Sequence, residues 1–69
     1  MENNDVVKVY SSPDPVMVNI AKAIFQEHDV EFFELNKRDS TYIMLGEDEL
    51  YVNVKDEHFA RLLLEQNQL

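Results

Sequence analysis

The stretch DVVKVYSSPDPVMVNIAKAIFQEHDVEFFEL, from Asp5 to Leu35, decides the fold. Residues 6–10 are β-branched or aromatic apart from Lys8, a composition that favours a strand. Residues 30–35 predict a second strand, in which Phe32 and Phe33 point to opposite faces. The polar and proline-rich residues 11–15 break the first pattern and lead into a helix.

The helix between these strands has a clear start. Asp14 precedes a proline, which disfavours the helical region for it, so Asp14 is expected as the N-cap and Pro15 as the first helical residue. The helix is expected to end near His28, where Asp29 replaces the glycine that usually forms a left-handed cap. Its apolar positions, which recur at helical spacing, are Val16, Met17, Ile20, Ala21, Ala23, Ile24 and Phe25.

The rest of the chain predicts further strands and a helix. Residues 41–45 and 49–54 have strand composition and flank a turn at 46–48, so a hairpin is expected in which Leu45, Ile43 and Thr41 oppose Leu50, Val52 and Val54 on a buried face. Asp56 is the expected N-cap of a second helix, and residues 65–69 are expected to fray. The apolar side of that helix is formed by Phe59, Ala60, Leu62, Leu63 and Leu64.

These elements predict one α+β domain over residues 1–69, ordered from about residue 5 to about residue 66. The order is βαββα, or βαβββα if residues 41–45 form a separate strand. Both helices cover one face of a small sheet, which is a two-layer, ferredoxin-like sandwich lacking the final strand. The other sheet face is left bare.

The bare face is the candidate interaction surface, since exposed apolar patches usually mark binding sites. The strand pattern places Tyr51, Asn53 and Tyr42 on it. For the first strand the pattern leaves two alternatives, either Val6, Lys8 and Tyr10 or else Val7 and Val9. The candidate residues are therefore Tyr10, Tyr42, Tyr51 and Asn53.

Composition limits the function. With 14 acidic and 6 basic residues the formal net charge is -8, which argues against nucleic acid and anionic membranes as partners. No stretch has the roughly 20 apolar residues of a membrane span, and the first residues do not resemble a signal peptide. A cytoplasmic location is expected. A chain this short buries only about 60% of its unfolded surface, and dimerisation is a common remedy.

Catalytic and ligand-binding patterns are missing. Ser11 and Ser12 belong to no nucleophile motif, and the single glycine excludes a phosphate-binding loop. The acidic residues 47–49 are too few for a calcium loop and are expected to be a solvated turn. We therefore expect no enzyme, cofactor or metal. His28 and His58, with Asp29 or Asp56 nearby, could bind a divalent metal. The alternative is therefore a small-molecule or metal-sensing domain that binds near the helix ends, in the region of Asp14, His28 or His58.

Tyr10-Ser11-Ser12, Asp14-Pro15, Asp29-Val30, Leu50-Tyr51-Val52 and the Asp56-Glu57 helix start resemble a family of small bacterial domains described as prokaryotic signal-transducing proteins. The resemblance covers nearly the whole chain, with Asp29 where that family usually has glycine. It implies a fold grouped with the nitrogen-regulatory PII proteins, but none of the PII nucleotide-binding residues is present, so no ligand is implied. It also implies a regulatory role.

The opening also resembles glutaredoxins. That family places a Cys-x-x-Cys motif near residues 14–17, and this chain has no cysteine. We interpret the likeness as a shared βαβ pattern. The sequence thus predicts a small cytoplasmic, non-enzymatic regulatory or protein-interaction module, with a homodimer through the sheet and an unidentified protein as expected partners.

Overall fold

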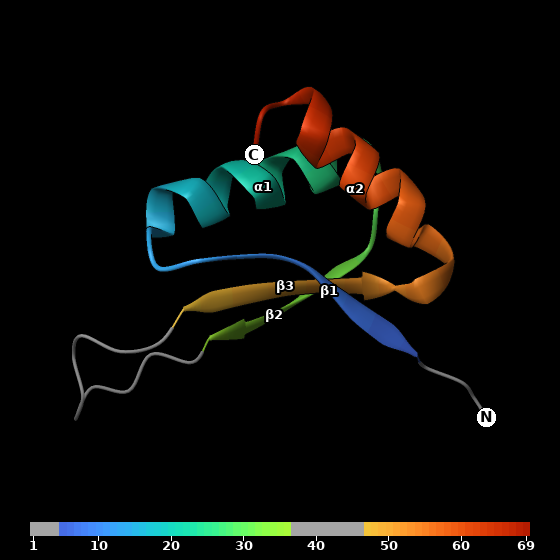
Figure 1. Ribbon diagram of the computed structural model, residues 1–69, viewed down its shortest axis with the longest axis horizontal. Coiled ribbons are helices and arrows are strands. Elements are labelled where there is room, and N and C mark those ends of the chain that lie inside the picture. Colours follow the sequence, from blue (N-terminus) through green and yellow to red (C-terminus); the bar gives the residue numbers. More distant parts are fainter. Residues whose placement is uncertain (1–4, 37–46) are drawn as a thin grey trace.

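The computed structural model describes residues 5–36 and 47–69. Their elements are β1 (Val6–Ser12), α1 (Pro15–Glu27), β2 (Phe32–Asn36), β3 (Asp48–Asn53), a short 3-10 turn η1 (Val54–Asp56) and α2 (Glu57–Gln66). The two helices form one layer and the three strands form the other (Figure 1). The predicted α+β sandwich of order βαββα is confirmed for these residues.

The strand order in the sheet is β1-β3-β2. Because β3 is antiparallel to both neighbours, β1 and β2 run parallel with β3 inserted between them. The segment from β1 through α1 to β2 is therefore a split βαβ unit, consistent with the ferredoxin-like arrangement. In this order β1 and β2 are the two edges of the described sheet.

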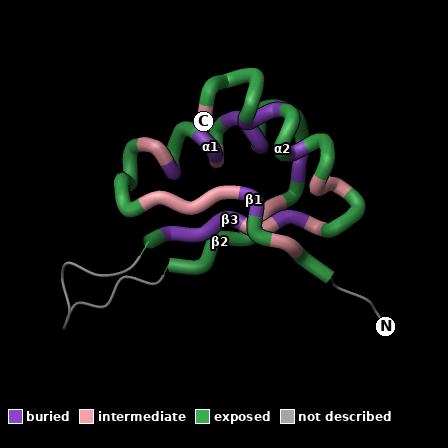
Figure 2. Tube along the Cα trace, viewed as in Figure 1, coloured by how far each residue is buried: buried purple, intermediate pink, exposed green. Residues whose placement is uncertain are grey.

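The core lies between the two layers (Figure 2). Val52 and Leu50 contribute from the middle strand, and neither side chain is accessible to solvent. Phe25 of α1 is also fully buried and packs against Phe32 of β2, with ring centroids 5.9 Å apart. The buried hydrophobic residues are Val9, Val18, Ala21, Ile24, Phe25, Val30, Leu50, Val52, Ala60, Leu63 and Leu64.

The pairing predicted for the middle strand needs a correction. Leu50 pairs with Tyr10 and Glu34, and Val52 pairs with Val7 and Phe32. The expected partners in residues 41–45 lie outside the described residues. Local alternation predicted which residues of β3 face the core, but the strand partners depend on contacts between distant segments.

Both helices end in the same backbone motif. Asp29 has φ 59° and donates its N–H to Gln26 O, while Val30 N donates to Phe25 O at 2.9 Å. These bonds form a Schellman motif, and Val30 is held in the helix cap, so β2 begins at Phe32 and not at residue 30.

The expected N-cap of α1 is confirmed, because the Asp14 carboxylate accepts the Val16 N–H at 2.9 Å.

Residues 65–69, which were expected to fray, continue α2 to Gln66 and then form a capped turn. Gln68 has φ 62° and donates its N–H to Glu65 O, and Leu69 N donates to Leu64 O at 3.0 Å. Leu69 also packs against the core. The apolar contact after the second Schellman motif is what fixes the end of the chain.

Several residues expected in the core are exposed. Val54 was expected on the buried face of a strand, but β3 ends at Asn53 and Val54 is half exposed in η1. Val16, Ile20, Phe59 and Leu62 are exposed as well. Each helix packs on one side only in a two-layer fold, so the buried stripe is narrower than the apolar content of the helix.

Candidate interaction surface

The sheet face away from the helices is formed by side chains from all three strands. Directly paired residues in a sheet share a face, and successive residues alternate. The pairs on this side are Val6 with Asn53, Tyr51 with both Lys8 and Phe33, and Glu49 with both Ser11 and Leu35. We call these residues the open face. No described helix covers it (Figure 1).

The open face carries a cluster of apolar side chains. Val6, Phe33 and Leu35 are 41%, 46% and 45% exposed. Together with Tyr51, Asn53 and the edge residue Glu34 they line a shallow depression of about 530 Å³. Three exposed apolar residues at one depression on a small domain are typical of a protein-binding surface.

Beside this cluster, Glu49 is held in a small polar network. Its carboxylate accepts the Tyr51 hydroxyl at 2.7 Å and lies 3.5 Å from Lys8 Nζ, and its side chain is only 10% exposed. These partners compensate the burial of the carboxylate. The hydrogen bond to Glu49, followed by desolvation and the negative charge, raises the pKa of Tyr51 above its ordinary value of 10.0. Tyr51 therefore stays protonated and donates at neutral pH.

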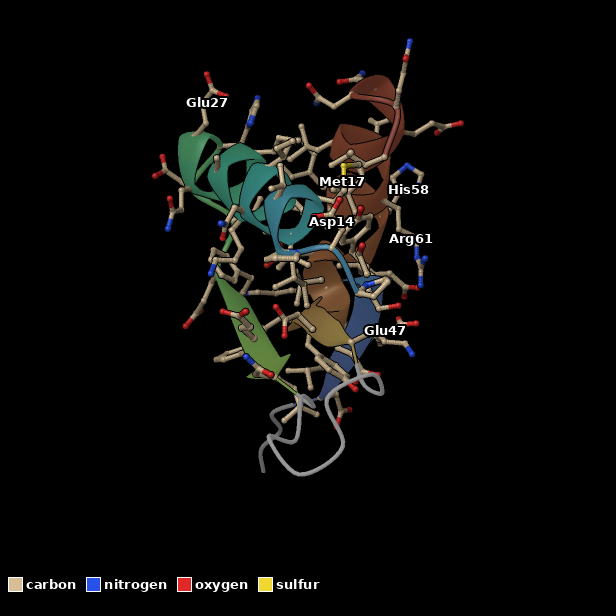
Figure 3. All side chains as sticks on the ribbon, turned by 90° about the vertical axis from the view of Figure 1, so that its left-hand side faces the viewer. Asp14, Met17, Glu27, Glu47, His58 and Arg61 are labelled. Carbon is tan, nitrogen blue, oxygen red and sulfur yellow. The ribbon has the colours of Figure 1, made fainter. Side chains whose placement is uncertain are left out.

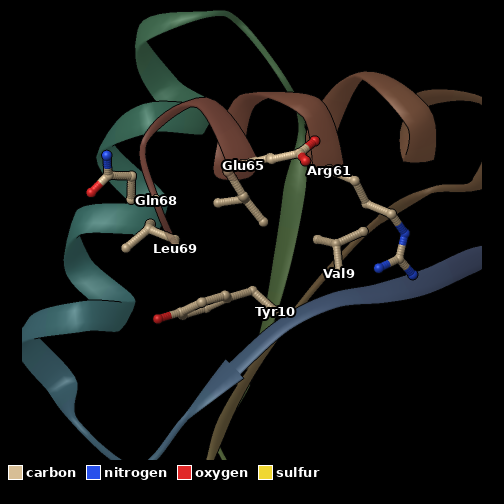
Figure 4. A pocket seen from close by; sticks show the side chains of 7 residues that line it. Val9, Tyr10, Arg61, Glu65, Gln68 and Leu69 are labelled. Carbon is tan, nitrogen blue, oxygen red and sulfur yellow. The ribbon is translucent and has the colours of Figure 1, made fainter.

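An irregularity in β1 decides which residues reach the open face. The register shifts between Lys8 and Tyr10, so Val9 is an extra residue and is buried with the core. A bulge turns the residues after it to the other face relative to strict alternation. Tyr10 consequently pairs with Leu50 and packs on the helix side, with its ring beneath α2 (Figure 4). The placement of Tyr10 on the bare face is therefore wrong.

A second depression, of about 430 Å³, lies on the helix side between β1 and the end of α2. Arg61 extends from α2 beside β1 (Figures 3 and 4). Its guanidinium donates to Glu57 at 2.9 Å and to the backbone oxygen of Lys8 at 3.2 Å. The residues that line this depression are Val9, Tyr10, Arg61, Leu64, Glu65, Gln68 and Leu69.

The structure brings together only part of the candidate set. Tyr51 and Asn53 lie on the open face, as alternation along β3 predicted. Tyr42 lies outside the described residues. Sequence reasoning missed Phe33 and Leu35, although the prediction that Phe32 and Phe33 face opposite sides already contained the signal. Once Phe32 is assigned to the core, Phe33 and Leu35 follow on the open face.

The alternative hypothesis named Asp14, His28 and His58 near the helix ends, and the first two contact backbone groups of their own helix. Asp14 caps α1. His28 is within 3.1 Å of Ile24 O through Nδ1, and its ring meets that of Phe59 edge-on at 6.3 Å. The end of α1 and the start of α2 therefore do lie close together, but His58 is exposed. Within residues 5–36 and 47–69, no three His, Asp or Glu side chains are grouped as metal ligands would be.

Comparison with known proteins adds no relative. No family model, no curated protein and no solved structure matches this chain. None of the helices in the described part of the chain has the length and apolar character to span a membrane.

Proposed function

We propose that this chain is a small, non-enzymatic regulatory or protein-interaction module that associates through its sheet. The exposed apolar cluster of Val6, Phe33 and Leu35 on the open face is the observation that carries the proposal. The resemblance to bacterial signal-transducing domains supports a regulatory role in the cytoplasm. A protein partner has to match this shallow apolar depression, which Tyr51 also lines.

Charge supports the sheet as the place of contact. The chain has a formal net charge of -8, so two copies repel each other through most of their surfaces. On the open face the only described charged residues are Lys8 and Glu49, which form an ion pair. A neutral apolar surface on an acidic molecule is where close approach costs least electrostatic energy.

Substitution of the apolar cluster tests the proposal. Phe33 retains about 90 Å² of accessible area, taking its 46% exposure and about 200 Å² for the side chain. Burial of this area at about 25 cal/mol per Å² contributes up to about 2 kcal/mol, depending on how much of it the partner covers. We expect Phe33→Ser with Leu35→Ser to weaken self-association at least tenfold, measured by sedimentation equilibrium.

Ile20→Ser with Leu62→Ser is the matched control, because these helix residues have similar exposures of 42% and 40%. The control is expected to associate like the unchanged chain. Equal association of both double variants, or a loss confined to the helix pair, would contradict the assignment of the contact surface to the sheet. Circular dichroism of each variant establishes that the fold is retained.

A further inference from the structure

The two edges of the described sheet differ in how their backbone groups are protected. β1 lies at one edge and β2 at the other. The Lys8 carbonyl on β1 accepts a hydrogen bond from Arg61, and the Lys8 side chain adds a charge at the same place. Natural sheets use such cations to prevent an edge from pairing with another chain. The β2 edge differs, although Glu34 is paired there with Lys22. Phe33 and Leu35 are apolar and exposed. No side chain of the described residues is hydrogen-bonded to an outward backbone group of Phe32 or Glu34 as Arg61 is to Lys8.

The hydrogen-bond alternation shows which β2 groups point outward. Val54 N donates to Asp5 O at 3.1 Å, so the following pair that exchanges hydrogen bonds between β3 and β1 is Val52 with Val7. The Lys8 carbonyl agrees with this alternation, because it points away from β3 and accepts a hydrogen bond from Arg61 instead. The backbone N–H and C=O groups of Tyr51 and Glu49 therefore point to the other side of β3 and form their hydrogen bonds with β2.

It follows that Phe33 and Leu35 bond to β3, while the N–H and C=O groups of Phe32 and Glu34 point away from the sheet. Glu34 is the middle residue of the five-residue strand. An antiparallel copy of β2, related by a two-fold axis at Glu34, therefore places the N–H and C=O groups of Glu34 opposite those of Glu34 in the second copy.

We propose that two copies of this chain pair through the β2 edges, giving a continuous six-stranded sheet with Glu34 at the two-fold axis. In this register Phe33 lies opposite Leu35 of the second copy. The two residues form a non-hydrogen-bonded pair, in which side chains approach more closely than in a hydrogen-bonded pair. The two apolar clusters then join into one surface across the axis. The inference rests on the proposed function, since it specifies the geometry of the self-association.

Charge at the axis is compatible with this pairing. The two Glu34 carboxylates come near each other, but each is neutralised by Lys22 of α1, with Nζ 3.0 Å from Oε1. The same two-fold operation at the β1 edge would place Lys8 beside Lys8 of the second copy and displace Arg61 from the Lys8 carbonyl. The second copy therefore fits β2 and not β1.

The contact between the two β2 strands is small. It buries less than the ~800 Å² per partner of a stable interface, so the dimer is weak and its population depends on protein concentration.

Single-cysteine cross-linking tests the register, and the chain has no cysteine of its own to interfere. The Cα atoms of facing hydrogen-bonded residues are about 5.5 Å apart, which suits a disulfide. We expect Glu34→Cys to form disulfide dimers in a glutathione redox buffer at least tenfold faster than Asn53→Cys or Lys8→Cys. In the paired sheet each of those two positions is separated from its copy by about 25 Å, once the offset along the strand is added to the spacing between strands.

Preferential cross-linking of Asn53→Cys would overturn the edge pairing in favour of two stacked open faces, and equal rates at all three positions would overturn it as random collision. If the unchanged chain has the monomer mass at every concentration, the proposed self-association itself fails. If the unchanged chain dimerises and Glu34→Cys does not cross-link preferentially, only the edge geometry fails.

A backbone measurement on the full chain is independent of disulfide geometry. We expect hydrogen exchange at the Phe32 and Glu34 amides to slow at least tenfold between micromolar and millimolar protein, with Phe33 and Leu35 protected throughout. Glu34→Pro removes the outward N–H, which an edge strand tolerates, and is expected to abolish dimerisation, whereas Glu34→Ala keeps the N–H and the dimer. The proposal would be overturned if the exchange rates of the Phe32 and Glu34 amides did not change with protein concentration while the measured mass doubled.

Discussion

Replacing Asp29 by glycine is expected to stabilise the protein, because the backbone at this position has φ 59°. A side chain with a Cβ costs roughly 1–2 kcal/mol in the left-handed region, and Asp tolerates it better than most residues. Asp29 also places a negative charge at the negative end of α1, an unfavourable contact of about 0.3–1 kcal/mol. Glycine removes both costs but loses about 0.4–1 kcal/mol through the greater entropy of the unfolded chain.

The sum predicts that Asp29→Gly raises the free energy of unfolding by about 1 kcal/mol, from the magnitudes of the left-handed and dipole terms. For a domain of this size that corresponds to an increase in Tm of about 4–8 °C. Urea unfolding followed by circular dichroism measures the difference. Val30 N to Phe25 O and the burial of both side chains should persist, since the cap geometry is unchanged.

Asp29→Ala is the matched control, because it removes the same carboxylate and keeps the Cβ. We expect Asp29→Gly to be more stable than Asp29→Ala by about 1 kcal/mol. If the two variants unfold at the same urea concentration, the left-handed backbone is not a source of strain, and the reasoning from φ is refuted.

Three further perturbations follow from individual contacts. Asp14→Ala removes the acceptor of the Val16 N–H and should lower the free energy of unfolding by about 1 kcal/mol in urea, while Asp14→Asn keeps most of it; equal stability of all three chains would contradict a capping role. Leu50→Ala empties a fully buried site and should cost about 2–5 kcal/mol, leaving much of the chain unfolded by circular dichroism at 25 °C; an unchanged spectrum and melting curve would contradict its place in the core. Because the folded chain holds the Tyr51 proton more tightly than the unfolded chain, this contribution is fully present below pH 10.0 and is lost as the pH rises through the raised pKa. Ultraviolet titration against Tyr51→Phe should place that pKa above 10.0, and Glu49→Ala, which removes the acceptor, should lower it; an unchanged titration in Glu49→Ala would exclude Glu49 as the cause.

The sequence was most informative where the decisive interactions are local. The Asp14 cap depends on residues within two positions of each other, and the left-handed Asp29 follows from the end of an apolar pattern. Alternation in β3 assigned Leu50 and Val52 to the core and Tyr51 to the opposite face correctly, because a strand has a period of two whichever strands flank it.

Features that depend on distant contacts were not predictable in this way. The bulge at Val9 moves Tyr10 to the helix side, and no local residue pattern announces it. Likewise, the end of β3 before Val54 is set by the start of η1 beneath α2, which the continuing β-branched composition conceals. Phe33 was assigned to its face by alternation, but its importance emerged only once all three strands were placed together.

The mass of the unchanged chain in solution, measured by light scattering from micromolar to millimolar concentration, tests association through the sheet most directly. The chain has a mass of 8.1 kDa. We predict an average mass that rises with concentration toward twice that value, and that rises much less when Phe33 and Leu35 are replaced by serine. A mass of 8.1 kDa at every concentration would contradict the account.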